Sequence, residues 1–230
     1  MKKLFAVLMA ALLLAGCSSA PTAEELAEQG YVLNPAENGY VAQPALPESP
    51  RDTTKTYKPS KDAGETACTA DAYAPACSSI GVDNLYQYLN RDDVVYIDLR
   101  DYVDYSKKHL RNFEVVPYFA LIFDANAGTE GKPQLFGGDV TAPVATYEES
   151  DDLLEVYFPK DKTIFLMCQS GGRVGNMMKL LAAKGYDMNK IFNVGGMGQY
   201  TAAEYAEYTV DTAEVAVNAT YSFEGLTPVK

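Results

Sequence analysis

Residues 163–186 read "TIFLMCQSGGRVGNMMKLLAAKGY", and this stretch decides the fold. The apolar run 163–167 is short and has the composition of a buried strand. Apolar residues recur at helical spacing after Arg173, and Gly185 provides the C-terminal stop of that helix. Cys168 lies between the two, at the start of a glycine-containing turn. The stretch therefore predicts a strand, a turn and a helix, with a cysteine at the carboxyl end of the strand.

Similar strands and helices flank this unit on both sides. Further apolar runs predict strands at 94–99, 113–118 and 191–194. Helical patterns cover 82–90, 101–109, 151–158 and 201–208. Strands that alternate with helices predict an α/β fold, with a central parallel sheet of about five strands and helices on both faces. Ligands of such sheets bind beyond the carboxyl ends of the strands, which is where Cys168 is expected.

The turn after Cys168 has the composition of an anion-binding loop. Gly171 and Gly172 can adopt conformations that direct consecutive backbone amides toward the sulfur. The positive end of the following helix dipole and the charge of Arg173 add to this effect. All of these favour a thiolate, which is the nucleophilic form of cysteine. We therefore expect a site that stabilises a negatively charged sulfur on Cys168; the alternative is a structural cysteine that merely follows a strand.

Three segments resemble a known family. "CQSGGRV" (168–174) resembles the active-site loop of single-domain rhodaneses, in which C-x-S-G-x-R is common. "VVYIDLRDYVDYSKKHL" (94–110) is similar to an earlier signature of that family, a strand that ends in Asp-x-Arg. "KGYDMNKIFNVGGMGQY" (184–200) is similar to the stretch after the active-site helix, with its paired glycines. The resemblance covers roughly residues 79–205.

The resemblance implies a sulfurtransferase that needs neither cofactor nor metal. Cys168 would accept a sulfane sulfur from a small donor, thiosulfate or a persulfide, and pass it to a thiol or cyanide acceptor. The backbone amides of the following loop would hold the Cys168 persulfide. These are the amides of Gln169, Ser170, Gly171, Gly172 and Arg173. Gln169 is neutral at a position that is often basic in thiosulfate-using members, which argues against thiosulfate as the physiological donor.

Three further residues are expected near the loop. Asp98 and Arg100 should form an ion pair at a neighbouring strand end, with direct substrate contact as the alternative. His109 is expected to be a structural imidazole and not a catalyst. Because it is the only histidine and the chain contains no C-x-x-C motif, the sequence does not indicate a metal site.

Two other functions fit the same residues. Phosphatases and arsenate reductases of this architecture also use a cysteine and an arginine, but their loops are one residue longer than the four residues between Cys168 and Arg173. The shorter loop suits a single sulfur atom better than a tetrahedral oxyanion. A non-catalytic docking or redox-sensing module is the second alternative. Its Cys168 would form mixed disulfides with exported partners, and the insertion 118–150 would carry the specificity.

The first residues predict export. Lys2 and Lys3 precede an apolar run, 4–15, that is too short to span a bilayer but suits a secretory signal. The sequence before Cys17 resembles the lipobox of bacterial lipoproteins. This implies a signal peptide at 1–16, a lipid on Cys17 and anchoring to a bacterial membrane, on the cell surface or the periplasmic face. The alternative is a plain signal peptide with a chance cysteine.

The charge balance limits the partners. The chain has 19 basic and 31 acidic side chains, for a net charge of −12, and removal of 1–16 makes it more negative. Such a surface repels nucleic acid and anionic headgroups. Lipid, and not charge, should therefore provide the contact with the membrane.

The remaining segments complete the predicted organisation. Residues 17–65, rich in proline, are expected to be a flexible tether after the lipidated cysteine, or else to pack on the domain. Residues 66–78 form a lead-in, in which Cys68 and Cys77 either form a disulfide or remain thiols, one of which could resolve an oxidised Cys168. The rhodanese-like domain spans 79–208, and its insertion 118–150 is a lid, a docking surface or padding. Residues 209–230 are a C-terminal extension with strand-like character at 214–223.

Overall fold

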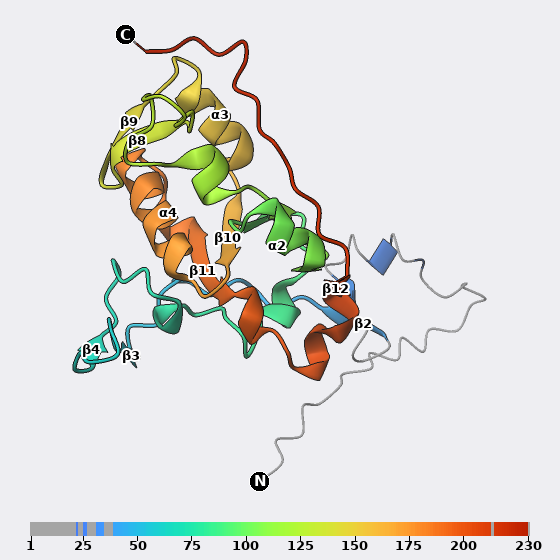
Figure 1. Ribbon diagram of the computed structural model, residues 1–230. Coiled ribbons are helices and arrows are strands. Elements are labelled where there is room, and N and C mark those ends of the chain that lie inside the picture. The colour runs from blue at the N-terminus through green and yellow to red at the C-terminus, as the bar shows by residue number, and fades with distance from the viewer. Residues whose placement is uncertain (1–21, 23–24, 27–30, 35–38, 213, 230) are drawn as a thin grey trace, which may run out of the picture.

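A computed structural model describes residues 22, 25–26, 31–34, 39–212 and 214–229 (Figure 1). The expected signal peptide, 1–16, and the expected lipidation site, Cys17, lie outside the described residues. Within the described part of the chain, no helix has both the length and the apolar character needed to cross a membrane.

A central sheet of four parallel strands organises the domain. Its order is β11–β10–β5–β7. The strands span Ile191–Gly196, Thr163–Cys168, Val94–Asp98 and Glu114–Val115, in that order. β10 pairs in parallel with both β5 and β11, so it is a central strand. The predicted α/β fold is confirmed, and the sheet is close to the expected size.

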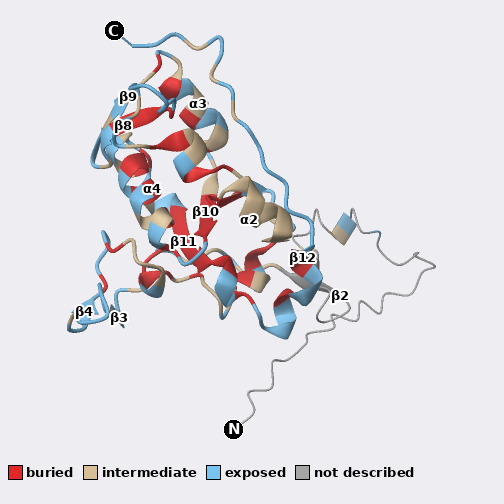
Figure 2. Cartoon of the chain, in the orientation of Figure 1, coloured by how far each residue is buried: buried red, intermediate tan, exposed pale blue. Residues whose placement is uncertain are grey.

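Alternating side chains of the sheet build two cores. Ile164, Leu166 and Cys168 face one side and pack with the apolar face of α4 (Gly172–Ala183). Phe165 and Met167 face the other side, where they pack with aromatic residues from outside the sheet. Figure 2 shows this buried material along β10 and β11. The apolar run 163–167 thus appears continuous in sequence because both faces of its strand are covered.

Three of the predicted helices form, and two are corrected. α3 (Ser150–Tyr157) and α4 form where they were expected, whereas α2 (Tyr102–Lys107) ends before His109, which lies in a strand. The segments 82–90 and 201–208 contain only short 3-10 helices, Leu85–Tyr88 and Ala203–Tyr208. In the first of these segments, a side chain accepts a backbone hydrogen bond that a longer helix would use internally. The Tyr86 amide donates to the Tyr205 hydroxyl at 3.3 Å. A tertiary contact here replaces the local helical hydrogen bond.

Part of the second half of the expected tether packs on the domain, which was the alternative to a flexible segment. The Arg51 guanidinium is buried and donates to the carbonyl oxygens of Met188 and Ile191 at 2.7 and 2.9 Å. Gln43 donates to the carbonyl oxygen of Leu89 at 3.1 Å. The short strands β3 (Thr56–Tyr57) and β4 (Thr66–Ala67) form a hairpin, and β1 (Tyr31–Asn34) pairs with β2 (Gly39–Ala42). Gln43 and Arg51 thus dock their part of the segment on the domain, because their side chains satisfy carbonyl groups there.

The insertion and the C-terminal extension each contain short regular elements. The insertion contains a π-helical turn, Tyr118–Ile122, and a hairpin of β8 (Phe136–Asp139) and β9 (Ala142–Ala145). The extension begins with β12 (Thr209–Asp211), which pairs with β6 (Lys108–Leu110). It then runs along the domain as an irregular segment (Figure 1).

The strand-like interpretation of residues 214–223 is wrong. The segment is held by separate contacts instead of a ladder: Phe223 stacks on Tyr147 with ring centroids 5.8 Å apart. The Glu148 amide donates to the Thr227 carbonyl oxygen at 2.9 Å. Among the described residues, the segment 214–223 pairs with no other strand. Its β propensity alone therefore did not produce a strand.

Candidate active site around Cys168

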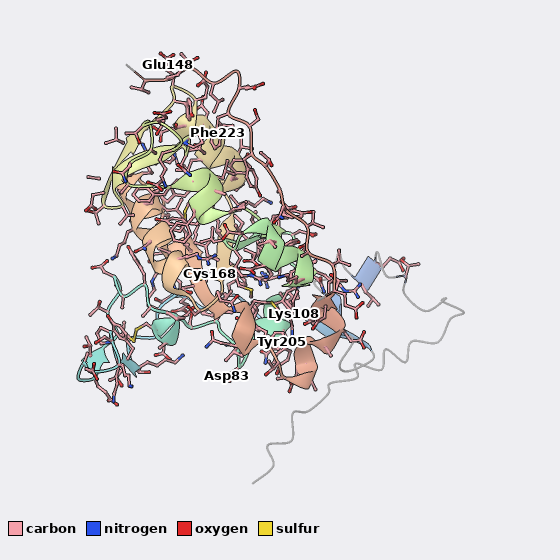
Figure 3. The ribbon with its side chains drawn as sticks, viewed as in Figure 1. Asp83, Lys108, Glu148, Cys168, Tyr205 and Phe223 are labelled. Carbon is pink, nitrogen blue, oxygen red and sulfur yellow. A yellow bond between two sulfur atoms is a disulfide. The ribbon has the colours of Figure 1, made fainter. Side chains whose placement is uncertain are left out.

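Cys168 is the last residue of β10 and lies at the carboxyl end of the parallel sheet (Figure 3). Its side chain faces α4 and retains 1% of its accessible surface. The Gly171 amide donates a hydrogen bond to its Sγ atom, with N and Sγ 3.1 Å apart. Cys168 is also a free thiol, since the other two cysteines of the described chain are joined to each other. The sulfur thus lies between a strand end and the start of a helix, with a backbone donor directed at it.

The two glycines of the loop have different roles. Gly171 has a φ of +89°, in the left-handed region, and is the N-cap of α4. Gly172 is already the first helical residue. Of the two consecutive amides that were expected to point at the sulfur, the Gly171 amide makes the hydrogen bond among the described contacts. Gln169 and Ser170 are exposed. Among the described residues, the Gly171 amide is the one that bonds to Cys168 Sγ.

Two neighbouring segments close on this loop. A Cβ atom at Gly171 would lie 2.7 Å from Cγ of Pro75. A Cβ atom at Gly196 would overlap the carbonyl of Gln169 and the amide of Ser170. Gly196 therefore permits a close backbone approach that a residue with a side chain would prevent. The contribution of Pro75 was missed, since nothing in the sequence around it indicates a contact with the turn at 171.

Arg173 lies at the edge of the site. Its guanidinium is 5.3 Å above the ring of Phe119, a residue of the insertion. Its Nη1 atom is buried and has no hydrogen-bond partner. Arg173 forms none of the ion pairs found among the described residues. A buried cationic donor without a partner can bind an anion.

Asp98 and Arg100 form the expected ion pair at the end of β5. The Arg100 guanidinium donates to both carboxylate oxygens of Asp98, with Nη2–Oδ2 at 2.6 Å and Nε–Oδ1 at 3.0 Å. Arg100 also donates to the carbonyl oxygen of Lys108 at 2.6 Å. Burial raises the pKa of Asp98, against the opposing effect of the Arg100 hydrogen bonds. All these contacts are internal, so the pair fixes the strand end and the following helix.

His109 has the structural role that was expected. It lies in β6, and its Nδ1 atom is 2.8 Å from the carbonyl oxygen of Tyr105. Its ring also stacks on the Tyr105 ring, with centroids 4.0 Å apart. Both contacts anchor the imidazole to Tyr105 of the preceding helix α2.

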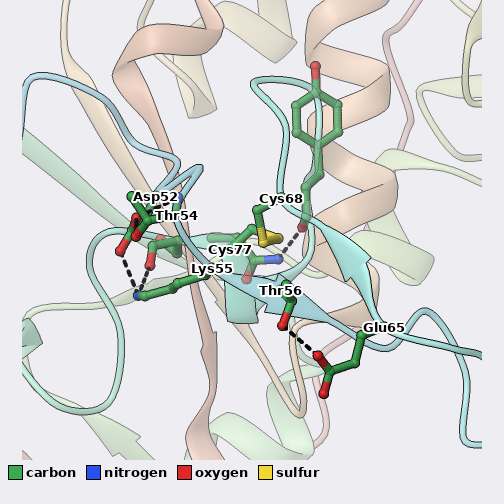
Figure 4. The surroundings of a disulfide bond; sticks show 10 residues. Asp52, Thr54, Lys55, Thr56, Glu65, Cys68 and Cys77 are labelled. Atoms are coloured by element: carbon green, nitrogen blue, oxygen red, sulfur yellow. Dashed lines mark hydrogen bonds and ion pairs between the residues drawn. A yellow bond between two sulfur atoms is a disulfide. The ribbon is translucent and has the colours of Figure 1, made fainter.

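Cys68 and Cys77 form the disulfide that was one of the two expected states. Their Cα atoms are 5.5 Å apart, and both residues are buried. Figure 4 shows the bond beside the docked segment that carries Asp52 and Lys55. The Cys68 amide donates to the Lys55 carbonyl oxygen, and the Asp52 amide donates to the Cys77 carbonyl oxygen. The loop that this bond closes contains Pro75, so the disulfide restrains a direct neighbour of the active-site turn.

Two surface cavities lie beside the site. A cavity of about 310 Å³ is lined by Pro75, Gly195 and Gln199, among others. A larger one, of about 810 Å³, lies along the edge of β5. Cys168 lines neither cavity.

The arrangement defines a class of protein: a parallel α/β domain with a cysteine at a strand end and a short amide loop that leads into a helix. A family model described as the rhodanese-like domain matches residues 81–203, and the chain belongs to this family. The chain is also similar to a solved structure described as rhodanese with anions from E. coli, with 18% identity and a TM-score of 0.31. That similarity covers 51% of this chain and 98% of the other. A comparison with curated proteins found no match.

Proposed function

We propose that this protein is a rhodanese-type sulfurtransferase in which Cys168 carries the transferred sulfur. The observation that supports this most is the Gly171 amide, 3.1 Å from Cys168 Sγ, at the N-terminus of α4. A backbone donor and a helix N-terminus both stabilise negative charge. A persulfide anion on Cys168 carries such a charge on its outer sulfur.

The reaction would proceed in two displacements. The Cys168 thiolate attacks the outer sulfur of a sulfane donor, and a bond between Sγ and that sulfur forms as the bond inside the donor breaks. With thiosulfate the leaving group is sulfite, which takes the electron pair. A cyanide or thiol acceptor then attacks the outer sulfur and leaves as thiocyanate or a new persulfide. Cys168 returns as a thiolate, so ping-pong kinetics are expected.

We propose that the positive charge of the Arg173 guanidinium attracts anionic sulfur donors. Its buried Nη1 atom lacks a partner, and its charge lies beside the start of α4. Gln169 adds no charge to the loop, which leaves a small persulfide as well suited to the site as thiosulfate. The exposed ring of Phe119 and the exposed side chain of Val144, both in the insertion 118–150, support a docking surface for an exported protein partner.

We also propose that the protein is exported and held on a bacterial membrane by a lipid on Cys17. The sequence before this residue supports the proposal. Membrane fractionation of the wild type and Cys17→Ser tests it. The variant should be released into the soluble fraction, and persistent membrane association would contradict the anchor.

Intact mass spectrometry tests the sulfur transfer directly. Incubation with thiosulfate or a small persulfide should make the protein one sulfur atom heavier, and cyanide should remove this atom. Cys168→Ser should show no adduct, and the disulfide of Cys68 and Cys77 is the same in both proteins. Formation of a mixed disulfide without any sulfur adduct would instead support a docking or redox module.

A further inference from the structure

Asn193 connects three segments around the active-site turn. It lies in β11, beside β10, and only 3% of its surface is exposed. Its Nδ2 atom donates to the carbonyl oxygen of Tyr73 at 2.7 Å and to that of Gly171 at 3.2 Å. Its Oδ1 atom accepts from the Gly195 amide at 3.0 Å. A single buried amide therefore joins the disulfide loop, the Cys168 loop and the paired-glycine turn.

The carbonyl that Asn193 holds belongs to a residue whose conformation matters to the sulfur. Gly171 donates its amide to Cys168 Sγ and has a φ of +89°. A glycine can leave this conformation easily, because it has many accessible backbone states. The hydrogen bond from Asn193 to the Gly171 carbonyl restricts that freedom.

The disulfide loop supports Asn193 from the outside. The carbonyl oxygen of Tyr73 accepts the shorter of the two hydrogen bonds that Asn193 donates. Tyr73 lies within the loop closed by Cys68 and Cys77. The Arg51 guanidinium lies over the Tyr73 ring, 5.0 Å from its centroid. The other acceptor of Asn193, Gly171, is in close contact with Pro75 of the same loop. The contacts thus run from the docked segment through Tyr73 and Asn193 to Gly171.

We propose that Asn193 is a positioning residue for sulfur transfer, which fixes Gly171 so that its amide points at the sulfur on Cys168. This inference rests on the proposed function. Asn193 itself has no hydrogen bond to Cys168 and acts through Gly171. A donor that is already oriented stabilises developing negative charge without reorganisation. Loss of the hydrogen bond from Asn193 to the Gly171 carbonyl should therefore slow the chemical step more than it weakens the binding of the sulfur donor.

Asn193→Leu removes the polar bonds and keeps a side chain of similar size. Asn193→Asp, which keeps the acceptor for the Gly195 amide and removes both donor bonds, serves if the leucine variant does not fold. Ser150→Ala is the matched control, since Ser150 is fully buried and its Oγ atom bonds to Leu135 and Tyr147. Glu148, two residues before Ser150 in the chain, lies at the end of the molecule away from Cys168 (Figure 3).

The assay measures kcat and KM with thiosulfate and cyanide, together with amide hydrogen exchange in residues 168–173, under conditions in which all variants are folded. We expect each Asn193 variant to lose about tenfold in kcat, with KM changed by less than about twofold, and the Gly171 amide to exchange about tenfold faster. Ser150→Ala should lower the unfolding midpoint but change neither kcat nor exchange in this loop.

Unchanged kcat and exchange in a folded Asn193 variant would overturn the proposal, as would an equal loss of kcat in Ser150→Ala. If the wild type forms no sulfur adduct, the proposed sulfur transfer itself fails. In that case amide hydrogen exchange alone tests whether Asn193 fixes Gly171. Faster exchange at Gly171 in the Asn193 variants supports this role, and unchanged exchange refutes it.

Discussion

Gly171→Ala should damage both the stability and the activity of the domain. The new methyl group would lie 2.7 Å from Cγ and 3.0 Å from Cβ of Pro75, whose ring cannot turn away. It would also occupy a φ of +89°, which costs a non-glycine residue about 1–2 kcal/mol. Overpacking against a fixed group adds about 1–3 kcal/mol. Together these terms lower the free energy of unfolding by about 2–5 kcal/mol.

Urea unfolding and the rate of sulfur transfer to cyanide measure the two effects. Transfer should fall at least about tenfold, because relief of the contact moves the Gly171 amide away from Cys168. Gly172→Ala is the matched control: its φ is not in the left-handed region, and no atom beyond its chain neighbours and its own helix lies within 4 Å of the added Cβ. It should change the free energy of unfolding by less than about 0.5 kcal/mol.

A double variant separates strain from contact. In a Pro75→Gly background the ring is absent, so Gly171→Ala should cost only the backbone term of about 1–2 kcal/mol. If Gly171→Ala in the wild-type background retains full transfer and unfolds within about 0.5 kcal/mol of the wild type, the left-handed turn and the Pro75 contact are not properties of the protein in solution.

Two further predictions concern the segments on either side of the domain. The double variant Cys68→Ser with Cys77→Ser should lose about 2.7 kcal/mol of stability to urea. It should also transfer sulfur more slowly, because Pro75 contacts the active-site turn; an unchanged rate in the folded variant would contradict this link. The Thr227 amide and hydroxyl lower the pKa of Glu149, so the stability that this contact contributes is present above the ordinary value of 4.5 and is lost as the pH falls through the lowered pKa. The NMR shift of the Thr227 amide should follow this titration and should lose it in Glu149→Ala; a shift that stays constant through this pH range would refute the contact.

Much of the domain follows from local sequence patterns. The run 163–167 alternates between the two cores, and the helical spacing after Arg173 places one apolar face of α4 on the sheet. These signals have the periods of a strand and a helix, so they can be read in a short window. The same applies to the position of Cys168 at a strand end and to the pairing of Asp98 with Arg100, which are only two residues apart.

The predictions that were wrong depend on tertiary contacts. The 82–90 segment gave only a 3-10 helix because the Tyr205 hydroxyl takes the Tyr86 amide, from 119 residues away in the chain. The docking of Arg51 on the carbonyls of Met188 and Ile191 likewise joins distant segments. The hydrophobic periodicity of a short segment carries no information about contacts between segments that are far apart in the chain.

The sequence alone therefore determined the parallel α/β scaffold, the cysteine at the strand end and the glycine turn that follows it. Only the tertiary structure decided what holds that turn in place. Asn193 and Tyr73 are 120 residues apart, and each is unremarkable in its own segment. They reach the Cys168 loop because parallel strand ends and a disulfide-closed loop meet at one edge of the sheet, and only the folded chain creates that meeting point.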